Sequence, residues 1–225
     1  MIREIVLDTE TTGLDPKFGH RIVEIGCVEL INHVATQKTY WQYINPERDM
    51  PEEAFAVHGL TKKFLSNKPC FGEIVEAFLA FVDDSPLIIH NAEFDVNFLN
   101  AELERANHAP LDLGRAIDTL QIARKKFPGA TVNLDALCRR FHIENADRAQ
   151  HGALKDAHLL AEVYLELIGG RQPDLAFTKE QIKIAKNDVK RMQNAYRPRQ
   201  YSASKEELAE HRQFLEKISE PIWER

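Results

Sequence analysis

The stretch Ile5-Val6-Leu7-Asp8-Thr9-Glu10-Thr11-Thr12-Gly13 predicts both a buried strand and the place of a functional site. Its first three residues form a short, β-branched apolar run, which predicts a strand. Side chains at positions i and i+2 of a strand point to the same face, so Asp8 and Glu10 would lie side by side at its end. Two carboxylates that close repel each other, and a hard divalent cation relieves the repulsion. The stretch therefore favours a cation site over the alternative, two solvated acids before a Thr-Gly turn.

The composition is typical of a soluble globular protein, with 225 residues, 44% hydrophobic residues and a net charge of −6. The charge is uneven, because basic residues exceed acidic ones within 178–225 while acidic residues dominate 1–177. An acidic domain binds nucleic acid poorly unless bound cations neutralise its site. Three widely separated cysteines match no zinc or disulfide spacing, and no apolar run is as long as a membrane span. We expect a cytoplasmic protein without a signal peptide.

The remaining pattern predicts a mixed-sheet α/β layer fold, because strands come first and a strand with several helices follows. A first domain would occupy 1–177, and a basic linker with a C-terminal segment would occupy 178–225. In that segment Ser204 and Glu207 fit a capping box, and apolar residues after them have helical spacing. The expected strands are 5–7, 21–30, 36–44 and 87–89, and the main expected helices are 93–105, 118–127 and 151–168.

Two further motifs supply acids and a histidine. Asp95 follows the strand at 87–89 and would lie in the first turn of a helix, where the helix dipole favours an anion. His151 and Asp156 are five residues apart and cannot share one helical face, so His151 must lie in the loop or first turn if both reach one site. Taken singly, each has a plain alternative as a capping or solvated residue. Together with Asp8 and Glu10, they suit two-cation phosphoryl transfer with a histidine that accepts a proton from water.

These residues resemble the motifs of the DEDDh family of 3′–5′ exonucleases, which has a ribonuclease-H-like fold. The motifs are Asp8-Thr-Glu10, His90-Asn-Ala-x-Phe-Asp95 and His151-x4-Asp156. Over about residues 3–177, the chain is most similar to the proofreading exonucleases of bacterial replicative polymerases. The resemblance implies catalysis with two divalent cations, Mg²⁺ or Mn²⁺. It implies that Asp8, Glu10 and Asp156 bind metal, that Asp95 supports the second metal and that His151 is the general base.

The same resemblance implies that Glu53 and His58 contact the 3′-terminal nucleotide of a DNA strand. Thr9, Thr11 and Phe94 would line the same cleft, next to the metal-binding acids Asp8, Glu10 and Asp156. The plain alternatives are an acid at a helix start for Glu53, a turn histidine for His58 and a core ring for Phe94.

The tail resembles partner-binding segments of the same proteins. Gln172, Leu175 and Phe177 match a short peptide that binds the bacterial sliding clamp, although such peptides also occur by chance. A small apolar helix beyond a polar linker cannot bury its face alone, so it would dock on the core or bind a partner. The resemblance implies that it binds the polymerase subunit, with these contacts: Leu208, Phe214, Leu215, Ile218 and Trp223.

Two other functions remain open from the sequence. The chain could be an RNA-directed enzyme of the same family, which a comparison of DNA and RNA substrates would decide because the 2′-hydroxyl is the difference. It could also be mainly a structural bridge between polymerase and clamp. The presence of all five catalytic residues argues against the bridge.

Overall fold

The computed structural model describes residues 2–145, 151–169 and 202–218. The chain divides into two compact units, Met1–Asp174 and Leu175–Arg225. The predicted boundary after residue 177 falls outside the described residues and stays a prediction. No helix in the described part of the chain is long and apolar enough to cross a membrane.

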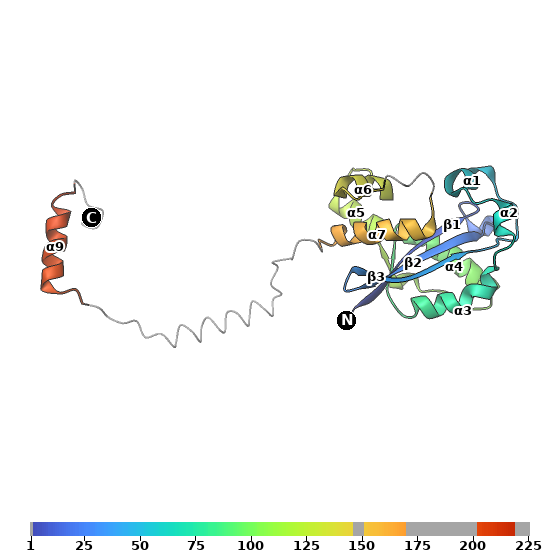
Figure 1. Cartoon of the computed structure of the whole chain (residues 1–225), viewed down its shortest axis with the longest axis horizontal. Helices are drawn as coiled ribbons and strands as arrows, with labels where there is room; N and C mark the ends of the chain where they lie inside the picture. Colours follow the sequence, from blue (N-terminus) through green and yellow to red (C-terminus); the bar gives the residue numbers. More distant parts are fainter. Residues whose placement is uncertain (1, 146–150, 170–201, 219–225) are drawn as a thin grey trace. The chain divides into compact units, whose positions relative to one another are not determined.

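The first unit is built on one five-stranded mixed sheet with the order β3-β2-β1-β4-β5. Figure 1 labels β1, β2 and β3 of this sheet. β1 pairs antiparallel with β2 and parallel with β4, β2 pairs antiparallel with β3, and β4 pairs parallel with β5. The central position of β1 explains its apolar start, because a strand covered on both faces is apolar without alternation. The strands are β1 (Arg3–Thr11), β2 (Ile22–Ile31), β3 (Val34–Tyr43), β4 (Leu87–Ile89) and β5 (Ala116–Asp118).

Helices cover both faces of this sheet, and each face has its own core. Ile5 and Leu7 of β1 pack with apolar residues of α3 and α4, whereas Val6 packs on the other face with α6 and α7. Figure 1 shows α3 and α7 on opposite faces of the strands. The helices of this unit are α1 (Glu52–His58), α2 (Lys62–Leu65), α3 (Phe71–Val82), α4 (Ala92–Arg105), α5 (Thr119–Lys126), α6 (Leu134–Phe141) and α7 (Ala153–Leu167), with 3₁₀ turns η1 (Pro16–Phe18) and η2 (Leu113–Arg115).

The predicted mixed α/β sheet is confirmed, but several element boundaries differ from those expected, and two of the differences affect the site. The helix expected over 118–127 begins at Thr119, because Ala116–Asp118 forms the edge strand β5 and the Asp118 side chain caps α5. A strand of three residues, such as β5, is too short to show the alternating pattern by which strands are predicted. The helix expected from residue 151 begins at Ala153, which leaves His151 in the loop before it.

The second unit contains α9 (Lys205–Leu215). The predicted capping box at its start is confirmed: the Glu207 amide donates to Ser204 Oγ at 3.1 Å, and the Ser204 amide donates to Glu207 Oε2 at 2.7 Å. None of the residues of α9 is buried. Leu208 is 50% exposed and Phe214 is 59% exposed, so this helix has no core of its own.

Candidate active site

The first pair of acids lies within β1, not after it, because the strand continues to Thr11. Asp8 pairs with Gly26 of β2 and Glu10 pairs with Glu24, so all four positions share one face of the sheet. This is the face that α7 covers, since Val6 belongs to the same side. Glu10 is buried and Asp8 is half-buried. The strand thus directs both carboxylates toward the start of α7.

The start of α7 brings His151 and Asp156 to this face. Asp156 lies in the first turn of the helix, is 2% exposed, and its amide donates to the carbonyl of Gly152. His151 Nδ1 lies 3.2 Å from Asp156 Oδ2. The His151 amide donates to the Val57 carbonyl at 3.2 Å, which ties this loop to α1. His151 therefore reaches Asp156 from the loop, one of the two positions, loop or first turn, that the five-residue separation allows.

Glu10, His151 and Asp156 form the group best placed to hold a cation. One potential ligand atom from each lies within 4.8 Å of the others. Two of the three are buried carboxylates, and buried charge is costly unless it is paired or bound to metal. Carboxylate oxygen with one imidazole nitrogen suits a hard or borderline divalent cation. Asp8 shares the strand face but is not in this close group.

Asp95 approaches the same strand from another side. The amide of Ile5 donates to Pro86, just before β4, and amides of alternate residues point the same way. The Thr9 amide therefore also points toward β4, beyond Val6, the last residue of β1 that pairs with that strand. Asp95 Oδ1 accepts this amide at 3.1 Å and the Thr9 hydroxyl at 2.7 Å. Asp95 thus binds the residue that stands between Asp8 and Glu10 in the sequence, from the side of β1 where β4 lies.

Burial raises the pKa of Asp95 well above its usual range, although the two hydrogen bonds from Thr9 oppose the shift. The charge of Asp118 raises the pKa further. Asp118 also accepts the amide of Asn91 at 3.1 Å, and Asn91 has a left-handed backbone (φ 71°) at the start of α4. The sequence interpretation gave Asp118 no role. Its position before a helix start was the available signal, since Asp is a preferred N-cap.

His58 lies at the end of α1, next to the His151 loop. It is 4% exposed, and burial lowers its pKa, with a smaller effect from the charge of His151. Its Nδ1 accepts the Leu60 amide at 3.0 Å, so the neutral ring carries its proton on Nε2. Nε2 is buried and has no hydrogen bond of normal geometry among the described residues, although the main chain of Thr11 interacts with the ring. The contact of His58 with the terminal nucleotide stays a prediction.

The other predicted substrate contacts have different surroundings. Thr9 is buried and both of its donors bind Asp95, while Thr11 donates its hydroxyl to the Gly13 carbonyl at 2.6 Å. Glu53 is exposed on α1. Phe94 is half-buried, and its ring centroid lies 5.0 Å from that of Phe98.

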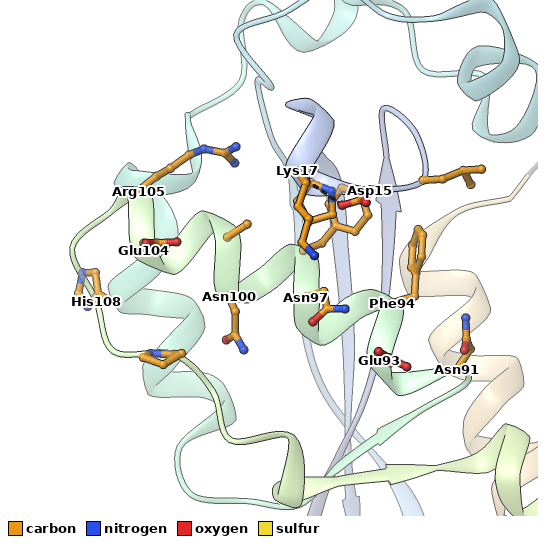
Figure 2. Close-up of a pocket in the computed structure, with 15 residues that line it drawn as sticks. Asp15, Lys17, Asn91, Glu93, Phe94, Asn97, Asn100, Glu104, Arg105 and His108 are labelled. Carbon is orange, nitrogen blue, oxygen red and sulfur yellow. Dashed lines mark hydrogen bonds between the residues drawn. The ribbon is translucent and has the colours of Figure 1, made fainter.

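Phe94 also lines a groove of 940 Å³ between η1 and α4. Figure 2 shows Phe94 at one end of this groove, and Asn97, Asn100 and Arg105 further along α4. Phe94 thus packs on Phe98 and also borders this groove, while its contact with the substrate stays a prediction. The predicted clamp-binding residues Gln172, Leu175 and Phe177 lie outside the described residues, and so does Trp223.

The exonuclease family RNase_T matches residues 5–164 of the chain. DNA polymerase III subunit epsilon of Rickettsia felis is 52% identical over 224 residues, which cover 96% of this chain and 97% of that protein. The protein of the same name from Escherichia coli K12 is 40% identical over 227 residues, covering 96% of this chain and 93% of that protein.

Solved structures agree with this result. Exonuclease X in complex with 5′ overhanging duplex DNA has a TM-score of 0.60 and 25% identity, covering 80% of this chain and 96% of that one. The nuclease domain of 3′hExo, a DEDDh family member bound to rAMP, has a TM-score of 0.64 at 18% identity, covering 75% of this chain and 92% of that one. The second likeness concerns the fold alone. The expected ribonuclease-H-like fold is confirmed.

Proposed function

Because the chain belongs to the exonuclease family and, within it, to the group of DNA polymerase III epsilon subunits, we propose that it proofreads the 3′ end of a DNA primer. It is a metal-dependent 3′–5′ exonuclease, and its product would be a 5′-mononucleotide. One observation carries the proposal at the level of the site: Glu10, His151 and Asp156 converge within 4.8 Å on the face of β1 that α7 covers.

The residues fit a site for divalent cations. Glu10 and Asp156 are 8% and 2% exposed, and such buried acids gain most from a bound cation. We propose that Asp8, Glu10 and Asp156 bind two cations, Mg²⁺ or Mn²⁺, and that Asp95 supports the second. When bound, such a pair stabilises the attacking and leaving oxygens of an in-line displacement. Asp95, fixed by Thr9, would complete the acidic set from the β4 side.

His151 is the proposed general base. If its Nδ1–H donates to Asp156, which lies 3.2 Å away, Nε2 is the basic nitrogen of the ring. This nitrogen would accept the proton of the attacking water. With a side chain 45% exposed, His151 can exchange that proton with solvent after each cycle. Asp156 would both orient the ring and stabilise its protonated form, as in other acid–histidine pairs.

The primer end would contact residues around this group. His58, which lies near His151, would contact the terminal nucleotide. Glu53 and Thr11 would contact the same nucleotide, and the Phe94 ring would pack on the base or sugar. Thr9 would act mainly through Asp95, because its amide and hydroxyl are already used there. A mismatched end would enter more readily, since its unpairing costs less.

We also propose two partner contacts. The exposed side chains of Leu208 and Phe214 on α9, with the half-buried Leu215 and Ile218, support binding to the alpha subunit of DNA polymerase III. Trp223 would extend this surface. The peptide Gln172, Leu175 and Phe177 would bind the sliding clamp.

The decisive experiment uses a 5′-labelled primer with a mispaired 3′ end, with Mg²⁺ or with EDTA. We expect stepwise shortening with Mg²⁺ and none with EDTA or in Asp156→Asn. Asp84→Asn removes an exposed acid of the turn after α3 and is the control. Undiminished cleavage by Asp156→Asn would reject the site, and faster cleavage of a matched RNA would reject DNA as the substrate.

A further inference from the structure

The first turn of α7 lies directly on β2, at the residue opposite Asp8. A Cβ built on Gly26 would lie 2.2 Å from the Leu154 amide nitrogen and 2.3 Å from the Ala153 carbonyl carbon. Gly26 is the pairing partner of Asp8 in β2. The absence of a side chain at position 26 thus allows the helix that carries Asp156 to approach the acids of β1.

The same turn has no cap from its own sequence. Gly152 occupies the N-cap position of α7 and has no side chain to accept the first free amides of the helix. Glu24 of β2 supplies the missing acceptor, because its carboxylate hydrogen-bonds to the Ala153 main chain. A Cβ on Gly152 would lie 3.9 Å from Glu24 Oε2, which places this oxygen at the helix start. A carboxylate at a helix N-terminus also interacts favourably with the helix dipole.

Trp41 of β3 fixes the other side of this acid. Its indole Nε1–H donates to Glu24 Oε1 at 2.6 Å. Glu24 is 3% exposed and lies opposite Glu10, with Asp156 close enough to add unfavourable charge. A third buried acid here is costly unless its hydrogen bonds hold it in place. Trp41 and Ala153 supply these bonds from two different elements.

We propose that Glu24, fixed by Trp41, is a positioning residue for the catalytic turn 151–156 and sets the distance from Asp156 to Glu10. Its carboxylate acts through the α7 main chain and contacts neither cation nor DNA. This inference rests on the proposed metal site, and it adds a residue that none of the three DEDDh motifs contains.

The test compares Glu24→Gln and Glu24→Ala with a matched buried acid of the same strand. Glu29 is also 3% exposed, but it faces the other side of the sheet and binds Arg3 at 2.8 Å. Mn²⁺ affinity is measured by calorimetry without DNA, and kcat, KM and the thermal midpoint are measured separately. Glu24→Ala is expected to weaken Mn²⁺ binding and lower kcat by roughly 10- to 100-fold, the range for groups that orient metal ligands. KM should stay within about twofold.

Glu24→Gln keeps one acceptor oxygen and should fall between wild type and Glu24→Ala. Trp41→Phe should change Mn²⁺ binding in the same direction, and it serves if Glu24→Ala fails to fold. Glu29→Ala should lower the thermal midpoint while leaving Mn²⁺ affinity and kcat near wild type. Equal loss of Mn²⁺ binding in Glu29→Ala and Glu24→Ala would overturn the proposal, because the effect would then be general destabilisation.

Two further outcomes separate this inference from the site itself. If Asp156→Asn loses Mn²⁺ binding while both Glu24 variants bind normally, the positioning role is wrong and the metal site stands. If Glu24→Gln loses binding as completely as Asp156→Asn, Glu24 is a ligand and the positioning role is again wrong. If Asp156→Asn binds Mn²⁺ like wild type, the metal site itself fails.

Discussion

Thr9 donates both its main-chain amide and its hydroxyl to a single oxygen of Asp95, at 3.1 Å and 2.7 Å. The two residues are 86 positions apart in the chain. The amide would have no strand partner on that side, because β4 ends before it reaches Thr9. A carboxylate from the first turn of α4 therefore takes the place of a strand partner, and it binds the residue that stands between Asp8 and Glu10 in the chain.

Thr9→Val should weaken this connection without changing side-chain volume. The variant keeps the amide bond to Asp95 and loses the hydroxyl bond, so we expect a loss of about 1.5–3 kcal/mol in unfolding free energy, typical of a bond to a charged group. Urea unfolding at pH 8, above the raised pKa of Asp95 of about 7, measures the loss. Thr39→Val, at an exposed position of β3, is the control and should cost less than about 0.5 kcal/mol. Equal effects at both positions would contradict the importance of the bond.

Asp95→Asn should stabilise the metal-free protein in a pH-dependent way. The folded pKa of Asp95 is raised by burial, so below the unfolded pKa of about 4 the group is neutral in both states and contributes nothing. As pH rises through this value the unfolded chain ionises first. The fold then loses about 1.4 kcal/mol for each pH unit that separates the unfolded pKa from the folded pKa, until the folded group also ionises. Asparagine removes this cost and still accepts both Thr9 bonds.

Thermal unfolding in EDTA at pH 4 and pH 8 tests this expectation. The midpoint of Asp95→Asn should exceed that of wild type at pH 8, and the difference should shrink toward zero at pH 4. A difference that is the same at both pH values would show that the Asp95 carboxyl does not titrate with a raised pKa.

Gly26→Ala should displace the first turn of α7. The added methyl group would lie 2.2 Å from the Leu154 amide nitrogen, so the helix must move away from β2. We expect a loss of about 1–3 kcal/mol in stability and a fall in kcat of up to ~100-fold, because small displacements of catalytic groups are costly. Gly72→Ala is the control, since a Cβ there meets nothing within 4 Å. It should stabilise α3 by about 0.5–1 kcal/mol with unchanged activity.

Replacing Leu208 and Phe214 together by Asp should separate polymerase binding from nuclease activity. We expect affinity for the polymerase alpha subunit to fall at least ~10-fold, as for exposed apolar contacts in an interface core. The exonuclease rate on free primer should not change. Gln213→Asp adds a charge to the same helix and serves as the control. Surface plasmon resonance measures the affinity, and normal binding by the double variant would exclude α9 as the contact.

The sequence could predict what depends on local spacing. Alternation in a strand placed Asp8 and Glu10 on one face, and the five-residue step from His151 to Asp156 required His151 to lie in the loop or first turn of the helix. The Thr9–Asp95 bond could not be predicted, because it depends on which strands become neighbours and where β4 ends. The ion pair of half-buried Arg21 with buried Glu102, at 2.6 Å, also depends on which elements become neighbours.

Glu24 shows a different reason for failure. In the sequence, Glu24 is one acid in a strand that the alternation of the other residues already predicts. Its role becomes visible only in the structure, where α7 lies on β2. A signal existed, since an acid within an otherwise apolar run, Ile22 to Cys27, is unusual in a strand covered on both faces. Buried acids of this kind need partners, and the partners, Trp41 and Ala153, come from distant parts of the chain.

The absence of a side chain at Gly26 affects how accurately a cell would copy its DNA. The proposed partner contacts lie in the tail and not on β2, so a larger residue at position 26 would leave an assembled polymerase that copies DNA but corrects few errors. We expect such an allele to appear as an increased frequency of spontaneous mutation. Selection would therefore act on this position through inherited errors accumulated over generations.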